Sequence, residues 1–507
     1  MSQSESFIYD EVPYPSFVFP QTHPDRLATL GRLMGIPTAS PESCRVLELG
    51  CGDGTNLCSH AYSLPNSSFV GIDLSTVEID SAKRSASELG LSNIEFHQAD
   101  VTDLDLDELG RFDIIVAHGL FSWVPDFVRE AMLNIYEQCL APNGIGYISY
   151  NALPGCRIRQ ISSEIMQYHS RNETDALKKV SLGIEGLRAV AAASAADSVY
   201  QAMLSLELDQ IADRTPENVF HDDHSTVNQP FYFHEFCSMI AGHGLKFLCE
   251  AEPSDMLDKG LSDEATKILD NFSSDPFERS QYRDLITGRR FRSSLICKAS
   301  NSPAPSPLLN EVDRSYLSTQ LTSEEDSRFD DDSTVQFDSA SGNNLKLNHP
   351  LTKFVLIELE HRRPETPSFS GLIDAARQAL ATEHTNEEHI ERLRSFLMQM
   401  FLAGFIKLHS FDLASHREIS DRPIASRFAR WQLERGSTTI TTINGANLEI
   451  EIPAVAKLIT LLDGSNDRSE IVRMIKEEFA PDQSEAEVER IVNENLNSIL
   501  NARLLVG

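Results

Sequence analysis

The fold is decided by the stretch Glu48-Leu49-Gly50-Cys51-Gly52-Asp53-Gly54, which joins an apolar run to a helical pattern. Cys44 to Leu49 is short and apolar, as a buried strand would be, and Gly54 to Leu64 has the pattern of a helix. Glycines between a strand and a helix permit positive φ and let a ligand approach the backbone closely. The stretch therefore predicts a ligand-binding turn at the carboxyl end of a sheet.

The alternation of strands and helices continues on both sides of this turn. Further strands are expected at Ser68–Leu74, Asn93–His97, Phe112–Ala117 and Ile145–Tyr150, and helices at Pro24–Met34, Thr76–Leu89 and Val124–Leu140. Continuous apolar strands separated by helices predict a parallel sheet covered on both faces. Residues 157–236 are mostly helical in pattern, and two more strands are expected at 244–252 and 290–299. We therefore expect a helical block inserted before the last two strands.

The chain is too long, at 507 residues, for one compact core. The predicted fold is α/β, a Rossmann-like doubly wound sheet with a helical insertion, followed by an α+β winged-helix-like C-terminal region. Residues 342–347 and 445–450 are similar turns that enter a strand, each followed by about three helices, and such repeats usually stack. The expected parts are an N-terminal arm at 1–43, a ligand-binding core at 44–156, a helical lid or regulatory region with the last strands at 157–300, an acidic Pro-rich linker at 301–333, and two winged-helix-like units at 334–415 and 416–507.

Composition excludes several classes of protein. The net charge of −32 is the opposite of the basic surface that a nucleic-acid binder needs, although a local basic groove near Arg289, Arg290 and Arg292 stays open. The eight cysteines include no CxxC pair, which fits reduced thiols in the cytoplasm. Residues 1–10 have no apolar signal core, and no apolar run is long enough to span a membrane. A soluble, cytoplasmic chain without membrane insertion is expected.

Acidic residues at three neighbouring strand ends favour S-adenosylmethionine over a dinucleotide as the ligand. The turn reads GxGxG rather than GxGxxG, and Glu48 precedes it. The acidic Asp53 within the turn would not help to bind an anionic pyrophosphate. Asp73 ends the second strand and can accept hydrogen bonds from ribose hydroxyls, and Asp100 ends the third, where it can take an adenine amino group. S-adenosylmethionine carries an ammonium and a sulfonium, which acidic neighbours favour. Helix capping explains any one of these acids, but not the set in this order.

These residues resemble a known family. Residues 48–54, 71–75 and Asp100 look like the motifs of Rossmann-type (class I) methyltransferases. A more specific resemblance, running from Tyr9 to about Lys298, is to the bacterial methyltransferases that carry a methyltransferase regulatory domain, a group that includes enzymes methylating lysines of outer-membrane proteins. It is carried by Tyr9-Asp10 with Pro13-Tyr14-Pro15, by Ala117-His118-Gly119 with Ser122-Trp123-Val124-Pro125, by Ser149-Tyr150-Asn151 with Pro154-Gly155, and by residues 230–236 with Gly244-Leu245.

Candidate site residues follow from these motifs. The candidates for cofactor binding are Tyr14, Glu48, Gly50, Cys51, Gly52, Asp53, Asp73, Leu74, Asp100, Val101 and His118, and those for catalysis are His118, Trp123, Tyr150 and Asn151. His118 is expected to position the acceptor or remove its proton; alternatively it bonds a backbone carbonyl and shapes its loop. Trp123 and Phe121 are expected either to form a wall of the pocket or to anchor the hydrophobic core. Tyr150 and Asn151 are expected on the acceptor side, and Tyr14 closes over the cofactor or merely packs.

The leading hypothesis is therefore methyl transfer from S-adenosylmethionine to a protein lysine, with the C-terminal units recruiting the substrate or forming a homodimer. A small-molecule methyltransferase, a non-catalytic S-adenosylmethionine-binding regulator and a dinucleotide oxidoreductase remain as alternatives. The Asp/Asn-Pro-Pro-Tyr motif of nucleic-acid and glutamine N-methyltransferases is absent after the fourth strand, which argues against a nucleic-acid substrate. No metal is expected, because His221, His224, His234, Cys237 and His243 lack the tight paired spacing of zinc ligands.

Overall fold

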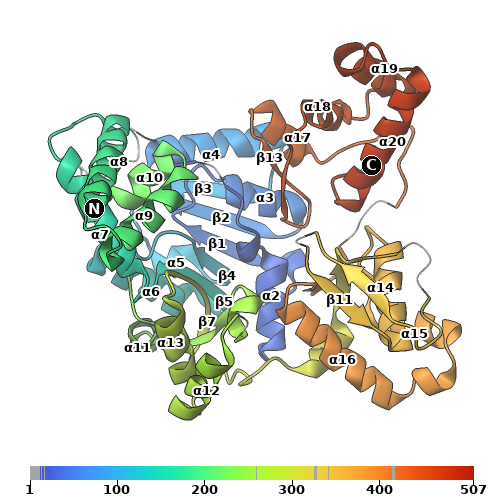
Figure 1. Cartoon of the computed structure of the whole chain (residues 1–507), viewed down its shortest axis with the longest axis horizontal. Coiled ribbons are helices and arrows are strands. Elements are labelled where there is room, and N and C mark those ends of the chain that lie inside the picture. Colours follow the sequence, from blue (N-terminus) through green and yellow to red (C-terminus); the bar gives the residue numbers. More distant parts are fainter. Residues whose placement is uncertain are drawn as a thin grey trace.

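The computed structural model describes residues 12, 14–15, 17–258, 260–324, 328–340, 342–413 and 417–507. Tyr9, Asp10 and Pro13 of the arm, and Glu325 and Asp326 of the acidic linker, lie outside these residues. A central sheet has the helical insertion on one side and the two C-terminal units on the other (Figure 1). Within the described ranges, no helix is both long and apolar enough to cross a membrane.

The central sheet is the expected Rossmann-like one. Its seven strands are ordered β3-β2-β1-β4-β5-β7-β6. Their bounds are β1 (Arg45–Leu49), β2 (Ser68–Asp73), β3 (Ile94–Gln98), β4 (Phe112–Ala117), β5 (Leu140–Asn151), β6 (Leu245–Glu250) and β7 (Phe291–Lys298). Strands β1 to β5 pair in parallel, whereas β7 runs antiparallel to both β5 and β6. The chain order reverses at β1, so the carboxyl ends of β1 and β4 flank a crevice where ligands of such sheets bind.

Helices cover both faces of the sheet, as the apolar strands predict. One face packs on α2 (Pro24–Leu33), α3 (Thr55–Ser63) and α4 (Thr76–Leu89). The other packs on α6 (Asp126–Cys139) and α11 (Phe233–Gly242), with the short α5 (Leu106–Leu109) beside α6. Helix α4 ends at Gly90, whose left-handed conformation (φ 69°) closes its last turn, as expected for a C-terminal glycine.

The helical insertion lies between β5 and β6, as expected. It consists of α7 (Cys156–Ser170), α8 (Ala176–Ala193), α9 (Val199–Ala212) and α10 (Pro216–Asp223), which share a core of their own. Helices α12 (Asp263–Phe272) and α13 (Pro276–Thr287) then separate β6 from β7. The basic groove left open near residues 289–292 does not exist, because Arg289 pairs with Asp255, Arg290 with Glu207, and the fully buried Arg292 with Glu250 and Asp284.

The first C-terminal unit begins earlier than expected, and the predicted linker 301–333 is wrong for its second half. Strand β8 (Tyr316–Thr319) pairs antiparallel with β12 (Ile406–His409), and β9 (Thr322–Ser323) pairs with β10 (Val335–Asp338). Apolar side chains within the predicted acidic linker explain why this segment is ordered: Leu317 is fully buried, and Val312 packs in the same hydrophobic cluster. The unit continues through β11 (Asn344–Leu347), α14 (Pro350–His361), α15 (Phe369–Ala379) and α16 (Glu387–Leu402).

The second unit repeats this plan on a smaller scale. It contains α17 (Arg427–Glu434), β13 (Thr439–Thr441), β14 (Asn447–Glu449), α18 (Pro453–Leu461), α19 (Arg468–Phe479) and α20 (Glu485–Asn501). In both units a two-stranded hairpin precedes three helices, and the chain after the last helix pairs with the segment that enters the unit. Short 3₁₀ turns complete the chain at η1 (Pro20–Thr22), η2 (Pro41–Ser43), η3 (Pro253–Met256), η4 (Leu309–Arg314) and η5 (Thr382–His384).

Candidate active site

A cavity of about 350 Å³ lies at the carboxyl ends of β1 to β4. This volume is at the lower end of the range usual for small-molecule sites. Its walls come from the glycine turn, from the ends of β2, β3 and β4, from residues near the N-terminus, and from helices α7 and α10 of the insertion. The candidate cofactor residues that line it are Tyr14, Glu48, Gly50, Cys51, Gly52, Asp53, Asp73, Leu74, Asp100, Val101 and His118. The sequence motifs thus converge on one space.

Two glycines of the turn are required for different reasons. Gly52 has φ 52°, and a Cβ built on it would meet nothing within 4 Å, so its backbone borders open space. Gly54 has φ 74°, and its Cβ would lie 2.7 Å from Cβ of Ala82 and 2.6 Å from the Phe96 ring. A side chain at 54 would therefore push α3 away from α4 and β3, whereas Gly52 keeps the backbone open to a ligand.

Glu48 is buried with half of its carboxylate unsatisfied. Its Oε1 accepts a hydrogen bond of 2.8 Å from Asn56 Nδ2, but its Oε2 has no partner within the described part of the chain. Burial raises the pKa of Glu48 to about 8, against the hydrogen bond from Asn56, and the nearby Asp53 and Asp73 add to the rise. A buried carboxylate with an unused oxygen indicates a site for a cationic ligand group.

The other strand-end acids hold the local backbone. Asp73 Oδ2 accepts from Gly52 N and its Oδ1 from Ser75 N, each at 2.9 Å. Asp53 accepts from Thr55 N and Oγ1, and Asp100 accepts from Thr102 N and Oγ1. These contacts hold the acids against the backbone at the edge of the cavity.

His118 follows β4 and is held by a side chain rather than by a backbone carbonyl. Its Nδ1 lies 2.8 Å from Tyr147 Oη, and this hydroxyl donates to Ser293 Oγ at 3.0 Å. Nδ1 must then carry the proton, and Nε2 is left as an acceptor. Burial lowers the pKa of His118 to about 4, so the ring is neutral at pH 7. The Phe19 ring lies across it, with ring centroids 3.8 Å apart.

Of the remaining catalytic candidates, Trp123 and Asn151 line the cavity, and Tyr150 does not. The Tyr150 ring is 1% exposed and stacks on Phe236 at 4.3 Å in the core of the opposite face. The prediction for Tyr150 is therefore wrong, because neighbouring residues of a strand point to opposite faces. Phe121 is also fully buried in that core, which is the structural alternative considered for it. Asn151 donates from Nδ2 to Asn228 Oδ1 at 2.8 Å.

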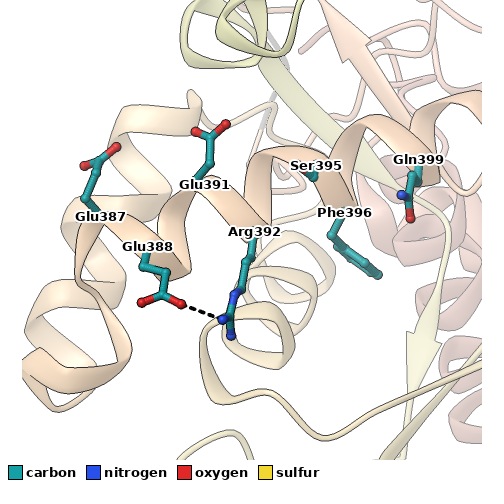
Figure 2. Close-up of a pocket in the computed structure, with 7 residues that line it drawn as sticks. All are labelled: Glu387, Glu388, Glu391, Arg392, Ser395, Phe396 and Gln399. Atoms are coloured by element: carbon teal, nitrogen blue, oxygen red, sulfur yellow. Dashed lines mark hydrogen bonds and ion pairs between the residues drawn. The ribbon is translucent and has the colours of Figure 1, made fainter.

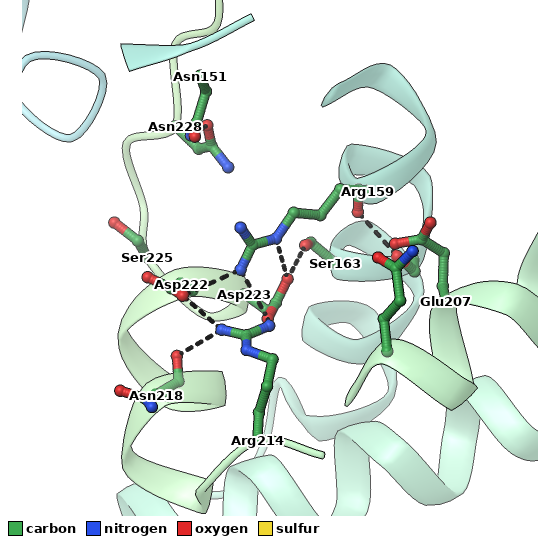
Figure 3. Close-up of polar contacts among 12 residues, drawn as sticks. Asn151, Arg159, Ser163, Glu207, Arg214, Asn218, Asp222, Asp223, Ser225 and Asn228 are labelled. Atoms are coloured by element: carbon green, nitrogen blue, oxygen red, sulfur yellow. Dashed lines mark hydrogen bonds and ion pairs between the residues drawn. The ribbon is translucent and has the colours of Figure 1, made fainter. Parts of the chain in front are cut away.

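Several lining residues escaped the sequence analysis. Asn56 stands in the first turn of α3, and only its hydrogen bond to Glu48 identifies it as part of the site. Arg159 of α7 and Asp222 of α10 border the cavity from the insertion. Arg159 makes a two-pronged contact with Asp223 at 2.9 and 3.2 Å, and Arg214 bridges Asp222 and Asp223, so that two arginines hold two aspartates (Figure 3). No sequence signal links residues so far apart.

The histidines near the insertion do not form a cluster. His221 bonds Val12 O at 2.6 Å, His234 bonds Gln281, and His243 bonds Asn134 and Glu130. Within the described ranges, no group of three or more His, Cys, Asp or Glu side chains could hold a metal ion.

A second hollow lies on α16 (Figure 2). All of its lining residues belong to this one helix, and the acidic face includes an ion pair of 2.5 Å between Arg392 and Glu388. A binding site needs groups that converge from several elements, so this surface is best described as a solvated helix face.

Known protein families match most of the chain. The family described as "Methyltransferase domain" matches residues 40–205, "Predicted methyltransferase regulatory domain" matches 215–298, and "PKMT, C-terminal winged helix domain" matches 421–502. An uncharacterized protein of Rickettsia prowazekii, RP789, is 32% identical over 92% of this chain and 85% of its own length. A second one, RP028, is 34% identical over 49% of this chain and 99% of its own length.

The fold also has a solved counterpart. The structure of PKMT2 from Rickettsia typhi in complex with AdoHcy matches 98% of this chain and 100% of that chain, with a TM-score of 0.86 and 24% identity. At this identity the match shows a common fold, including the C-terminal units. Together with the matched families and the full-length relative, the fold and the glycine-turn cavity identify the chain as a member of the class I S-adenosylmethionine-dependent methyltransferases that carry a methyltransferase regulatory domain.

Proposed function

We propose that this enzyme transfers the methyl group of S-adenosylmethionine to lysine side chains of a protein substrate. The observation that carries the proposal is the charge of the cavity. Among its described lining residues, a single guanidinium, Arg159, faces the carboxylates of Asp53, Asp73, Glu78, Asp100 and Asp222, and the buried Glu48 ionises when a cation lies beside it. Such a site favours both a cationic cofactor and a cationic acceptor. A small apolar acceptor would instead favour an apolar pocket.

The residues present fit the cofactor. The unsatisfied Glu48 Oε2 suits its ammonium group, and the open side of Gly52 leaves room against the backbone. Asp73 is proposed to hold the ribose hydroxyls, and Asp100 with Val101 the adenine. Tyr14, Phe17 and Phe19 cover the cavity from the N-terminal side.

The residues of the chain position the reactants and keep water away from them. When bound, the cofactor would supply an activated methyl group: an in-line nucleophile attacks the methyl carbon, and the bond from that carbon to the sulfonium sulfur breaks to leave a neutral thioether. Phe19 and Trp123 line the cavity. Apolar walls of this kind exclude water, which strengthens each charge interaction inside. A histidine with a pKa of about 4 cannot retain a lysine proton at pH 7, so we assign His118 Nε2 as a hydrogen-bond acceptor that orients the neutral amine. The amine proton leaves to solvent.

The C-terminal region supports a protein acceptor. Residues 421–502 match a winged helix domain found in PKMT proteins, and the structural neighbour carries the same name. The chain is acidic overall, with a net charge of −32, which favours encounter with a lysine-rich protein surface. Whether the units also mediate a homodimer stays a prediction.

Transfer of a labelled methyl group is the direct test of the acceptor. The full chain is incubated with methyl-labelled S-adenosylmethionine and a lysine-rich protein, and modified residues are located by mass spectrometry. Label is expected on lysine, and prior acetylation of the protein should abolish it, because the amide nitrogen is not a nucleophile. Label on another residue type, or only on added small molecules, would contradict the proposal.

His118→Asn should lower kcat by about tenfold, the loss expected for one orienting hydrogen bond, with little change in cofactor affinity. Asparagine can still donate to Tyr147 Oη but lacks the acceptor at the Nε2 position. Rates measured from pH 6 to 9 should rise with pH in both proteins, because the acceptor amine must be neutral. An inflection near neutral pH that disappears in the variant would show instead that His118 is the base.

A further inference from the structure

Residues 17–23 form a wall of the cavity. Phe17 and Phe19 line it, and the Phe19 ring lies on His118 with ring centroids 3.8 Å apart. The same segment passes through η1 into α2, so its position sets the shape of the cavity on this side. What holds residues 17–23 therefore also determines how the site is closed.

On the inner side, the wall is bonded to the residue that holds Glu48. Phe19 N donates to Asn56 Oδ1 at 2.9 Å, and Asn56 Nδ2 donates to Thr22 Oγ1 at 3.1 Å as well as to Glu48 Oε1. Thr22 Oγ1 donates to Phe19 O and contacts His60 Nε2 at 3.0 Å. Thr22, Asn56, His60 and Glu48 are each 5% exposed or less. A shift of the wall would therefore disturb the Glu48 carboxylate.

On the outer side, the second C-terminal unit holds the same segment. Asn447 Nδ2, at the start of β14, donates to Val18 O at 2.8 Å. The preceding turn approaches so closely that a Cβ on Gly445 would lie 3.0 Å from His23 Cδ2. The hairpin of this unit thus supports the wall at both of its ends.

The first C-terminal unit holds the continuation of the segment into α2. Asp25 is 5% exposed; its Oδ2 lies 2.8 Å from His409 Nδ1, and its Oδ1 accepts from Ser410 N and Oγ, each at 2.7 Å. Burial alone would raise the pKa of Asp25, but the hydrogen bonds from His409 and Ser410 outweigh it and the pKa is lowered. The buried charge therefore depends on this unit being docked.

We propose that the two C-terminal winged-helix-like units act as the outer support of the cofactor site, and that Asn447 and Ser410 are positioning residues that set how tightly and how long the cofactor is held. The inference rests on the cofactor lying under residues 17–23, as proposed above. If residues 17–23 spend less time in the position that closes the cavity, the apparent affinity for the cofactor falls in proportion, and the bound cofactor dissociates sooner. Docking of a substrate on these units would then change the affinity of the cofactor site.

The test compares Asn447→Ala with Asn495→Ala in the full chain. Asn495 lies in the same unit and donates a bond of 2.9 Å to Ile491 O within its own helix, away from residues 17–23. Affinity for S-adenosylhomocysteine is measured by calorimetry, its dissociation rate by a stopped-flow chase, and folding by thermal melting. Asn447→Ala removes the part-buried hydrogen bond to Val18 O, together with the bond that Asn447 Oδ1 accepts from Thr441 Oγ1 within the same unit. It should raise Kd and the dissociation rate about three- to tenfold, with both unchanged in Asn495→Ala.

A purely structural role would lower the melting temperature of Asn447→Ala without changing the dissociation rate, and that result would overturn the inference. If Asn447→Ala does not fold, Ser410→Ala replaces it; this variant removes one hydrogen bond to Asp25 and leaves its charge and the two bonds from His409 and Ser410 N. Failure of the wild-type chain to bind the ligand would refute the proposed site itself. Normal binding by the wild type and by both variants would refute only the support by the C-terminal units.

Discussion

Asp73→Ala is expected to raise the Kd for S-adenosylmethionine about 100-fold or more. The proposed ribose contact consists of two hydrogen bonds to a charged group, each of which contributes about 1.5–3 kcal/mol when made in a site of this kind. The variant also removes the bond from Gly52 N to Asp73, which orders the glycine turn. Calorimetric titration with S-adenosylmethionine measures the effect, and a parallel titration with NADH separates the cofactor classes.

Asp103→Ala is the matched control. Asp103 follows Asp100 at the same edge of the sheet, but it is exposed and is not among the described residues that line the cavity. It should bind like the wild type. If Asp73→Ala melts at the wild-type temperature and keeps wild-type affinity, the cofactor does not lie against β2 and the proposed site is wrong.

Glu48→Gln is expected to weaken cofactor binding about 10- to 100-fold, because the glutamine amide cannot pair with an ammonium as a carboxylate does. In the free protein the Glu48 pKa is about 8, so the side chain is mostly protonated at pH 7. The cofactor ammonium favours the ionised form, and binding at pH 7 should therefore release close to one proton. Calorimetry in buffers of different ionisation enthalpy measures this release, which should vanish in Glu48→Gln. Equal proton release in both proteins would assign it to another group.

The same substitution should stabilise the cofactor-free protein at alkaline pH. Burial raises the Glu48 pKa from 4.5 to about 8, so its contribution to stability is fully present below pH 4.5 and is lost as the pH rises through 8. Glutamine stays neutral, and the gain over the wild type at pH 9 is at most about 5 kcal/mol. Melting curves at pH 5 and pH 9 check this: the two proteins should differ little at the first pH and clearly at the second.

Local pattern was sufficient for the central sheet. Apart from the short α5, the strands and helices from β1 to α6 were predictable because each apolar run is bounded by glycine or polar residues within a few positions. The cofactor motif was predictable for the same reason: Glu48, Asp73 and Asp100 stand at the carboxyl ends of parallel strands, which must meet at one edge. Parallel pairing of the strands is what brings these three acids to the same edge of the sheet.

The face to which a β5 side chain points was not predictable. Tyr150 and Asn151 were both expected in the site, but only Asn151 lines it. Sheets covered by helices on both faces have apolar residues at consecutive positions, so the alternation that normally reveals the inward face is missing. Only the packing of Tyr150 on Phe236 decides the matter.

The sequence by itself determined the strands of the central sheet, its ligand-binding glycine turn and the family of the cofactor site, because these depend on residues close together in the chain. Only the tertiary structure decided that residues 316–323 belong to the first C-terminal unit, through pairing of β8 with β12, and that Arg159 and Asp222 border the cavity. It also placed Asp25 against His409, 384 residues away. A buried polar contact between distant segments satisfies groups that neither segment can satisfy alone, and nothing in either local sequence records its partner.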